Sequence, residues 1–320
     1  MKPKIFITRK IPKRIVTQIE EVCEVEMWEE EDTPIPREVL EKKVEDIEGL
    51  FCLLTESIDE ELLNKAKKLK IVSNMAVGYN NIDVGAAKER GITVTNTPGV
   101  LTETTADLTF ALLMATSRRI VEASDYLRDG KWETWSPMQL TGQDVYGATL
   151  GIIGMGRIGQ SVAKRAKGFD MNILYYNQSR KTEIEDRLGV RYVEMDQLLQ
   201  ESDFVVIMTP YTPETENLIA KRELAFMKES AILINTARGG IVDEEALYHA
   251  LKNNEIWAAG LDVFETEPIS QENPLLTLPN VVTVPHIGSA SIKTRLKMAE
   301  LAAENLINGV TDKKPAHVVV

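Results

Sequence analysis

Three charged side chains with complementary chemistry follow apolar, strand-like runs late in the chain: Arg238, Glu267 and His286. A guanidinium can bind a carboxylate through two parallel hydrogen bonds. An imidazole titrates near neutral pH and can give a proton to a reacting oxygen. A carboxylate beside that imidazole favours its charged form. Together the three groups could bind a carboxylate and supply a proton at the same site.

Each of these residues taken alone could be an ordinary surface charge, so their positions matter. His286 ends the apolar run at residues 281–285, at the carboxyl end of a predicted strand. Open α/β sheets bind their ligands at that edge. By contrast, His249 lies in a charged helix and His317 in the C-terminal tail. We therefore predict that His286 is the general acid.

A glycine-rich loop, with Gly154, Gly156 and Gly159, directly follows the apolar run at residues 149–153 and opens a predicted helix. In that context backbone N–H groups and the helix N-terminus can hold a pyrophosphate. A tight turn without a ligand is the alternative. Because the spacing coincides with a complete strand–helix–strand unit, we favour dinucleotide binding.

The turn after the next strand bears on which dinucleotide is used. NAD-binding units usually carry Asp or Glu there, but this chain has Asn177, followed by Ser179, Arg180 and Lys181. Neutral Asn177 does not repel a 2′-phosphate, and the next side chains can bind one. A solvated turn with ordinary basic residues is the alternative. We predict that NADP(H) is preferred and that NAD(H) is also usable.

These candidate residues must be positioned by a regular framework. Short β-rich runs alternate with amphipathic helices from residue 4 to residue 96, and the same alternation resumes between residues 149 and 284. Strands separated by helices indicate βαβ crossovers and parallel sheets. A helix expected to be buried spans residues 103–117, and a final helix is predicted at 291–307. We predict an α/β protein with two doubly wound sheets.

Composition excludes several classes of function. A length of 320 residues favours two domains. A net charge of −12 repels phosphate backbones, so nucleic acid is not an expected partner. The N-terminus lacks a signal-peptide pattern and no run approaches the ~20 apolar residues of a membrane span, so we expect a cytoplasmic protein without membrane partners. Cys23 and Cys52 lack metal-type spacing; we expect buried free thiols and no metal site.

Five motifs in order resemble those of the D-isomer-specific 2-hydroxyacid dehydrogenase family, and more narrowly its glyoxylate/hydroxypyruvate reductase branch. They lie at residues 74–83, 154–159, 235–240, 260–268 and 285–289. The resemblance covers nearly the whole chain. It implies a Rossmann cofactor domain inserted in a discontinuous, flavodoxin-like substrate domain.

The same resemblance implies the domain bounds. Residues 1–98 form the first part of the substrate domain, and residues 99–286 form the dinucleotide-binding domain. Within the latter, residues 120–146 form a dimerisation excursion that carries paired tryptophans. Residues 287–320, the C-terminal helix and tail, return to the substrate domain. The expected assembly is a homodimer.

Roles for individual residues follow from the resemblance as well. Arg238, Glu267 and His286 are the implied catalytic residues, and Asp262 holds the nicotinamide carboxamide. The implied substrate contacts are Leu53, the backbone N–H groups of Val77 and Gly78, Arg238, Ser289 and Trp135 of the partner subunit. The implied cofactor contacts are Thr104, Gly154, Gly156, Arg157, Ile158, Gly159, Asn177, Ser179, Arg180, Thr209, Pro210, Thr215, Ala237, Asp262 and Gly288.

The resemblance predicts NAD(P)H-dependent reduction of short 2-oxo acids to D-2-hydroxy acids. Glyoxylate and hydroxypyruvate are the expected substrates, with 2-ketogluconate as a longer candidate. The alternatives are another enzyme of the family, such as phosphoglycerate or D-lactate dehydrogenase, and a dinucleotide-gated, corepressor-like binding protein. Since such corepressors share the fold and the same residues, a turnover assay is needed to separate the last reading from the others.

Overall fold

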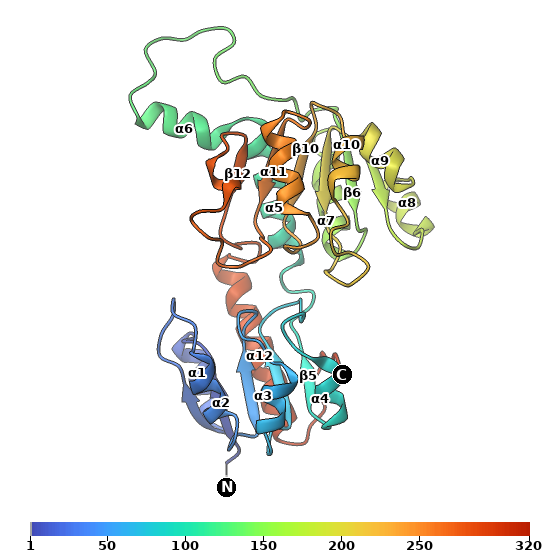
Figure 1. The fold of residues 1–320 in the computed structure, drawn as a ribbon. Helices are drawn as coiled ribbons and strands as arrows, with labels where there is room; N and C mark the ends of the chain where they lie inside the picture. Colours follow the sequence, from blue (N-terminus) through green and yellow to red (C-terminus); the bar gives the residue numbers. More distant parts are fainter. Residues whose placement is uncertain (1) are drawn as a thin grey trace. The chain divides into compact units, whose positions relative to one another are not determined.

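The computed structural model describes residues 2–320, which form two compact units, each with its own parallel sheet (Figure 1). The first unit comprises the chain up to Leu101 together with Ala290–Val320, and the second comprises Thr102–Ser289. The ladders that join neighbouring strands of both sheets are parallel. The predicted fold class, two doubly wound parallel-sheet domains, is confirmed.

The first unit has a five-stranded sheet in the order β2-β1-β3-β4-β5, which is the flavodoxin-like order. Every residue of β3 and β4 is buried, because helices cover both faces of the centre of the sheet. The elements are β1 (Lys4–Ile7), α1 (Lys13–Glu20), β2 (Glu24–Met27), α2 (Arg37–Lys43), β3 (Gly49–Cys52), α3 (Glu60–Lys65), β4 (Ile71–Asn74), α4 (Val84–Glu89) and β5 (Thr93–Thr95).

The last helix, α12 (Ile292–Val310), completes the core of this first unit. Its small residues Ala299, Ala302 and Ala303 pack in one apolar cluster with Ile5 and Ile71. The tail after the helix pairs with β5, where the Val319 N–H donates to the Val94 carbonyl at 2.7 Å. The C-terminal helix and tail therefore belong to the same unit as the N-terminal sheet.

The second unit has a seven-stranded sheet in the order β12-β11-β10-β9-β6-β7-β8. Six of these strands follow the order of a Rossmann fold, and β12 adds a further edge. The strands are β6 (Thr149–Ile153), β7 (Asn172–Tyr176), β8 (Arg191–Tyr192), β9 (Phe204–Ile207), β10 (Ile232–Asn235), β11 (Ala258–Leu261) and β12 (Val281–Thr283). The helices are α5 (Thr102–Ser117), α6 (Ile120–Arg128), α7 (Arg157–Lys167), α8 (Thr182–Leu188), α9 (Met195–Glu201), α10 (Lys221–Phe226) and α11 (Glu244–Lys252), with a 3-10 turn at Pro274–Thr277.

Helix α5 is the buried helix that the sequence predicts. Half of its residues are buried, including Phe110, Leu112 and Leu113, and it packs against β10, β11 and α7. The sequence pattern does not predict two of the helices, namely α8 and α10. Both have only six or seven residues, too few for a helical hydrophobic period to show.

The excursion after α5 extends away from the sheet of the second unit (Figure 1). Helix α6 contains no buried residue. In the following irregular stretch the side chains of Trp132, Trp135 and Met138 are 57%, 75% and 76% exposed. This segment therefore presents a large unburied apolar surface.

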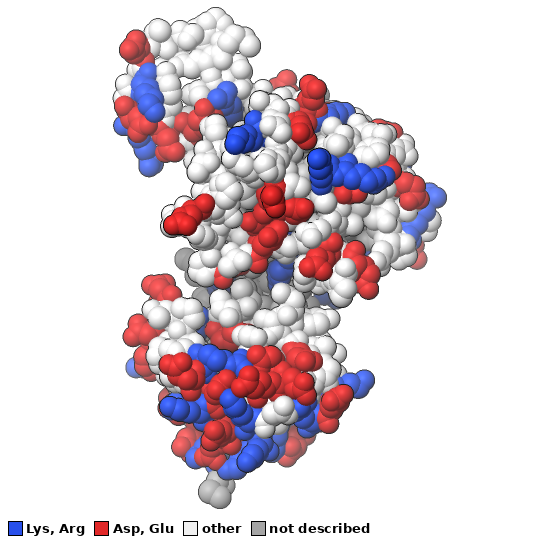
Figure 2. Space-filling view, viewed as in Figure 1, with Lys and Arg blue, Asp and Glu red and all other residues white. Residues whose placement is uncertain are grey.

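Charges of both signs are interspersed on the face shown in Figure 2, over both units. No helix among residues 2–320 is long and apolar enough to span a membrane. Cys23 and Cys52 are buried free thiols, as predicted. Burial raises the pKa of both thiols, so they stay neutral and unreactive.

Candidate active site

The three candidate catalytic side chains follow neighbouring strands of the second unit: Arg238 follows β10, Glu267 follows β11 and His286 follows β12. The imidazole Nδ1 of His286 lies 2.6 Å from Oε2 of Glu267. The other carboxylate oxygen, Oε1, accepts from the Phe264 N–H at 3.0 Å. Because Nδ1 is committed to the carboxylate, Nε2 is the nitrogen left to act on a ligand.

The electrostatics of this cluster favour an ionised Glu267. Burial raises the pKa of this carboxyl, but the hydrogen bond and charge of His286 together with the Arg238 charge outweigh burial, so the pKa lies below its ordinary value. Burial lowers the pKa of Arg238, and negative Glu267 opposes that effect. The guanidinium still remains charged at neutral pH. A cation, a carboxylate and an imidazole are thus concentrated at one edge of the sheet.

The backbone at His286 is held in an uncommon conformation, with φ at +49°. Its N–H donates to the Asp262 carbonyl at 2.9 Å and to the Val284 carbonyl at 3.1 Å. Left-handed backbone in a non-glycine residue costs free energy and concentrates at functional sites. The strained turn is what directs the imidazole toward Glu267.

Asn235, at the end of β10, is a positioning residue that sequence reasoning missed. Its amide Nδ2 donates to the Arg238 carbonyl at 2.9 Å, and its Oδ1 accepts from the Ala237 N–H at 3.1 Å. The side chain is 2% exposed. Asn235 therefore shapes the loop that carries Arg238. The signal that could have identified it is a polar residue at the carboxyl end of an otherwise apolar strand.

Asp262 is the most unusual ionisable group in this part of the structure. It is fully buried, and burial raises the pKa of its carboxyl to about 6, although the Ile287 N–H and the His286 charge oppose the shift. Oδ1 accepts from the Ile287 N–H at 2.6 Å, whereas Oδ2 is buried with no hydrogen-bond partner among the described residues. An unpaired buried acceptor calls for a donor from a ligand, and a carboxamide NH₂ supplies one.

The glycine loop has the geometry that a pyrophosphate requires. Gly154 has φ at +102°, and a Cβ there would lie 2.7 Å from the Met208 carbonyl at the end of β9. A Cβ on Gly159 would clash with the Gly154 carbonyl oxygen. A Cβ on Gly156, at the N-terminus of α7, would meet nothing within 4 Å. The loop thus leaves open space beside the N–H groups of a helix N-terminus, where a phosphate binds well.

The remaining predicted cofactor residues of this unit lie on α5, on α7 and on the loops after β9 and β12. Exposed Arg157 and half-buried Ile158 begin α7, and half-buried Thr104 lies on α5. After β9, the hydroxyl of Thr215 donates to the Pro210 carbonyl at 2.8 Å and so orders the loop that also carries Thr209. Gly288 contacts Asp262: a Cβ there would lie 3.1 Å from Oδ2. Half-buried Ser289 ends the unit.

In the turn after β7, Asn177 is used internally. Its Oδ1 accepts from the Met155 N–H at 3.2 Å, and its Nδ2 donates to the Ser179 carbonyl at 3.0 Å. Asn177 therefore ties the glycine loop to the basic turn. Ser179 and Arg180 are exposed.

The predicted substrate contacts of the first unit lie on loops at the carboxyl ends of its strands. The Asn74 side chain donates to the Gly78 carbonyl at 2.9 Å, and the Asn96 side chain donates to the Val77 carbonyl at 2.8 Å. These two amides fix the loop after β4. The Leu53 carbonyl accepts from Asn81 at 3.0 Å. That these groups contact a substrate stays a prediction.

Beside Leu53 the structure reveals a buried acid that sequence reasoning missed, Glu56, which is 5% exposed. Its carboxylate accepts from the Leu53 N–H at 2.8 Å and from the Thr8 hydroxyl at 2.7 Å, and Arg9 lies 3.5 Å away. Thr8 and Arg9 follow β1, and Glu56 follows β3. Polar residues directly after two neighbouring strands were the signal that could have found this network.

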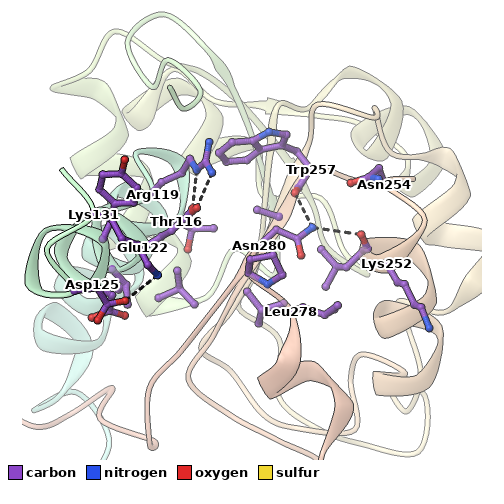
Figure 3. Close-up of a pocket in the computed structure, with 18 residues that line it drawn as sticks. Thr116, Arg119, Glu122, Asp125, Lys131, Lys252, Asn254, Trp257, Leu278 and Asn280 are labelled. Carbon is purple, nitrogen blue, oxygen red and sulfur yellow. Dashed lines mark hydrogen bonds and ion pairs between the residues drawn. The ribbon is translucent and has the colours of Figure 1, made fainter. Parts of the chain in front are cut away.

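A cavity of about 670 Å³ lies elsewhere in the second unit, between α6 and the β12 edge of the sheet (Figure 3). Glu122 of α6 and Arg119, which directly precedes this helix, line one side of the cavity. Trp257 and Asn280 line the other side. It contains none of the predicted catalytic or cofactor residues. The large cavity and the polar site are therefore separate features.

The family profile "D-isomer specific 2-hydroxyacid dehydrogenase, NAD binding domain" matches residues 110–288. A glyoxylate reductase of Korarchaeum cryptofilum is 55% identical over 100% of this chain and 96% of its own length. A crystal structure of a protein from Thermus thermophilus superposes with a TM-score of 0.93 at 45% identity, covering 99% of this chain and 100% of that one.

A third comparison bears on the cofactor. The NADPH-dependent glyoxylate/hydroxypyruvate reductase of Sinorhizobium meliloti, solved with NADP and malonate, has a TM-score of 0.85 at 33% identity and covers 100% of this chain and 97% of that one. The open glycine loop and the unpaired Asp262 oxygen fit a nicotinamide dinucleotide. From the matched profile, the identity over the whole chain and this geometry, the chain belongs to the D-isomer-specific 2-hydroxyacid dehydrogenase family, in its glyoxylate reductase branch.

Proposed function

We propose that this dehydrogenase reduces glyoxylate and hydroxypyruvate to D-2-hydroxy acids and prefers NADPH. The observation that carries the reaction is the 2.6 Å contact between His286 Nδ1 and Glu267 Oε2, with Arg238 on the neighbouring strand end. The printed names of the relatives, glyoxylate reductase and NADPH-dependent glyoxylate/hydroxypyruvate reductase, support the substrate class.

The roles of the side chains follow from their chemistry. When bound, the reduced nicotinamide supplies the hydride that goes to the carbonyl carbon. Arg238 binds the 2-oxo acid by charge-assisted hydrogen bonds and polarises its carbonyl. His286 gives a proton to the carbonyl oxygen from Nε2, while Glu267 holds the ring through Nδ1 and stabilises its charged form. Asp262 accepts a hydrogen bond from the carboxamide and so orients the nicotinamide.

The substrate class is tested with a panel of 2-oxo acids and both reduced cofactors. We expect the highest kcat/KM with glyoxylate and hydroxypyruvate, and turnover of 2-ketogluconate as well, because the acid is recognised mainly at its carboxylate and carbonyl. A preference for pyruvate or phosphohydroxypyruvate would instead identify a D-lactate or phosphoglycerate dehydrogenase. Dinucleotide binding without turnover of any acid would point to a corepressor-like binding protein.

The preference for NADPH depends on Arg180. A charge-assisted hydrogen bond to a 2′-phosphate contributes about 1.5–3 kcal/mol, which is roughly ten- to a hundredfold in kcat/KM. Since the Arg180 side chain is 60% exposed, we expect the lower end of that range. Arg180→Ala should therefore lower the ratio of kcat/KM for NADPH to that for NADH about tenfold, mainly through NADPH.

Arg187→Ala is the matched control, because it removes a guanidinium from an exposed position of α8 instead of from the turn. Its ratio should stay near that of the wild-type protein. An NADH preference in the wild-type protein, or an Arg180→Ala ratio equal to the wild-type ratio, would contradict the proposed preference.

We also propose a homodimer in which the excursion covers a second copy. The exposed apolar side chains of Trp132, Trp135 and Met138 support this, since such patches usually mark interfaces. If Trp135 reaches the partner's substrate, Trp135→Ala should raise KM for hydroxypyruvate several-fold and leave the dissociation constant of the cofactor unchanged. Sedimentation of the wild-type protein as a monomer at micromolar concentration would refute the dimer.

A cytoplasmic location is part of the proposal. The free thiols of Cys23 and Cys52 support it, because secreted proteins usually oxidise paired cysteines whereas reducing compartments keep thiols free. Fractionation of cells of the source organism, followed by an activity assay of each fraction, tests it.

A further inference from the structure

In the basic turn after β7, an internal carboxylate already engages the arginine. Nε of Arg180 donates to Oε1 of Glu185 at 2.8 Å, and Nη2 donates to Oε2 at 2.8 Å. This is a bidentate pair. Arg can bind a phosphate bidentately through the same two N–H groups.

The Glu185 carboxylate is itself held by a hydrogen bond from a residue of β7. Its Oε1 accepts from the Tyr175 hydroxyl at 2.9 Å, and that hydroxyl accepts from the Lys181 N–H at 2.8 Å. Tyr175 is fully buried in the sheet, and the Glu185 side chain is only 15% exposed. The carboxylate is therefore a fixed part of the turn, whereas the Arg180 side chain is 60% exposed, with its guanidinium 5.8 Å from the centre of the Tyr192 ring.

The charge balance of the turn follows from this pair. The carboxylate of Glu185 offsets the charge of Arg180, so a 2′-phosphate in this turn meets a weaker positive field than Arg180 alone would give. A phosphate that binds Arg180 must take its remaining N–H groups beside a negative carboxylate, or displace that carboxylate. Either route weakens binding through like-charge repulsion or a lost ion pair.

We propose that Glu185 is a specificity-determining residue that limits the selectivity of this enzyme for NADP(H) over NAD(H), by competing with the 2′-phosphate for Arg180. The inference rests on the proposed function, which assigns Arg180 to that phosphate. NAD(H) carries no 2′-phosphate and is not subject to the competition. The competition thus brings the two cofactors closer in affinity.

Glu185→Gln tests the proposal, because glutamine keeps the shape and can accept from Tyr175 while removing the negative charge. Isothermal titration calorimetry of the full-length protein would compare NADP⁺ with NAD⁺, and adenosine 2′,5′-bisphosphate with adenosine 5′-monophosphate. We expect selectivity for the 2′-phosphate to rise roughly threefold to tenfold, as removal of one charge near a dianion predicts. At about 1 M salt, where screening acts within about 3 Å, the gain should largely vanish.

Glu183→Gln is the matched control, since Glu183 is an exposed carboxylate two residues earlier in α8. It should change the selectivity by less than about twofold, because an exposed charge is screened. A Glu185→Gln selectivity that is unchanged or lower than that of the wild-type protein would overturn the proposal. A lower selectivity would mean that Glu185 positions Arg180 for the phosphate. An equal gain in Glu183→Gln would also overturn it, because the effect would then be general charge.

The outcomes separate this inference from the proposed NADPH preference. If the wild-type protein favours NAD⁺ but Glu185→Gln shifts binding toward NADP⁺, the competition holds and the preference fails. If Arg180→Ala lowers selectivity for NADP⁺ but Glu185→Gln does not raise it, the preference holds and the competition fails. If neither variant changes the selectivity, Arg180 does not bind the phosphate and both fail. Thermal unfolding of each variant shows whether the turn remains folded.

Discussion

Replacing His286 with glutamine should lower the turnover of hydroxypyruvate by about a hundredfold or more, the loss expected when a general acid is removed. Glutamine fills a similar volume and can still approach Glu267, but it cannot give up a proton at neutral pH. Because the glycine loop and Asp262 are unchanged, the dissociation constant of the cofactor should stay near the wild-type value. Steady-state kinetics and a cofactor titration measure the two quantities.

His249→Gln is the control for that substitution, since His249 is exposed on α11, a helix on the surface of the second unit. Its turnover should equal that of the wild-type protein. Turnover of His286→Gln within a few-fold of wild type would assign proton donation to another group.

A second large effect concerns stability rather than rate. The raised pKa of Asp262 means that the folded protein holds this proton more tightly than the unfolded chain does. As the pH rises from the ordinary value of 3.8 to about 6, the unfolded chain ionises first and the folded protein loses stability. Above pH 6 the ionised Asp262 lowers the free energy of unfolding by its full amount, about 3 kcal/mol. His286 reduces this cost and Glu267 adds to it.

Asp262→Asn should therefore make the cofactor-free protein more stable at pH 8, by up to about 3 kcal/mol, with a difference that shrinks toward pH 4. Urea unfolding at a series of pH values measures it. The same change at exposed Asp186 should leave the free energy of unfolding nearly constant. A pH-independent difference between Asp262→Asn and the wild-type protein would show that Asp262 is not the group responsible.

The parts of the structure that sequence reasoning predicts best depend on short-range patterns. Runs of four or five apolar residues mark the buried strands, and the glycine spacing at Gly154–Gly159 is a local requirement of one turn. Placing His286 at a strand end needs only the rule that ligands bind at the carboxyl edge of a parallel sheet. Local patterns of this kind are sufficient to predict the parallel sheets and the glycine loop, and to nominate the candidate side chains.

What sequence reasoning misses depends on contacts between segments. Arg180 and Glu185 are five residues apart, outside the spacings at which helical side chains meet, and their pairing depends on the Tyr175 hydroxyl from the preceding strand. The Glu56 network likewise joins residues 48 positions apart, because β1 and β3 are neighbours in the sheet. Such partners become visible only when the topology is known.

The place of α12 has a consequence for the order in which the protein is made. The apolar face that contains Ile5, Ile7 and Ile71 is covered by α1 and by α12, and α12 is translated after the entire second unit. Domains of a growing chain usually fold as units in the order of synthesis. Here the segment that emerges first has only α1 on that face of its sheet until the last helix leaves the ribosome. The later unit can finish folding before the earlier one, so nascent chains stalled before Ile292 should engage chaperones through the N-terminal sheet.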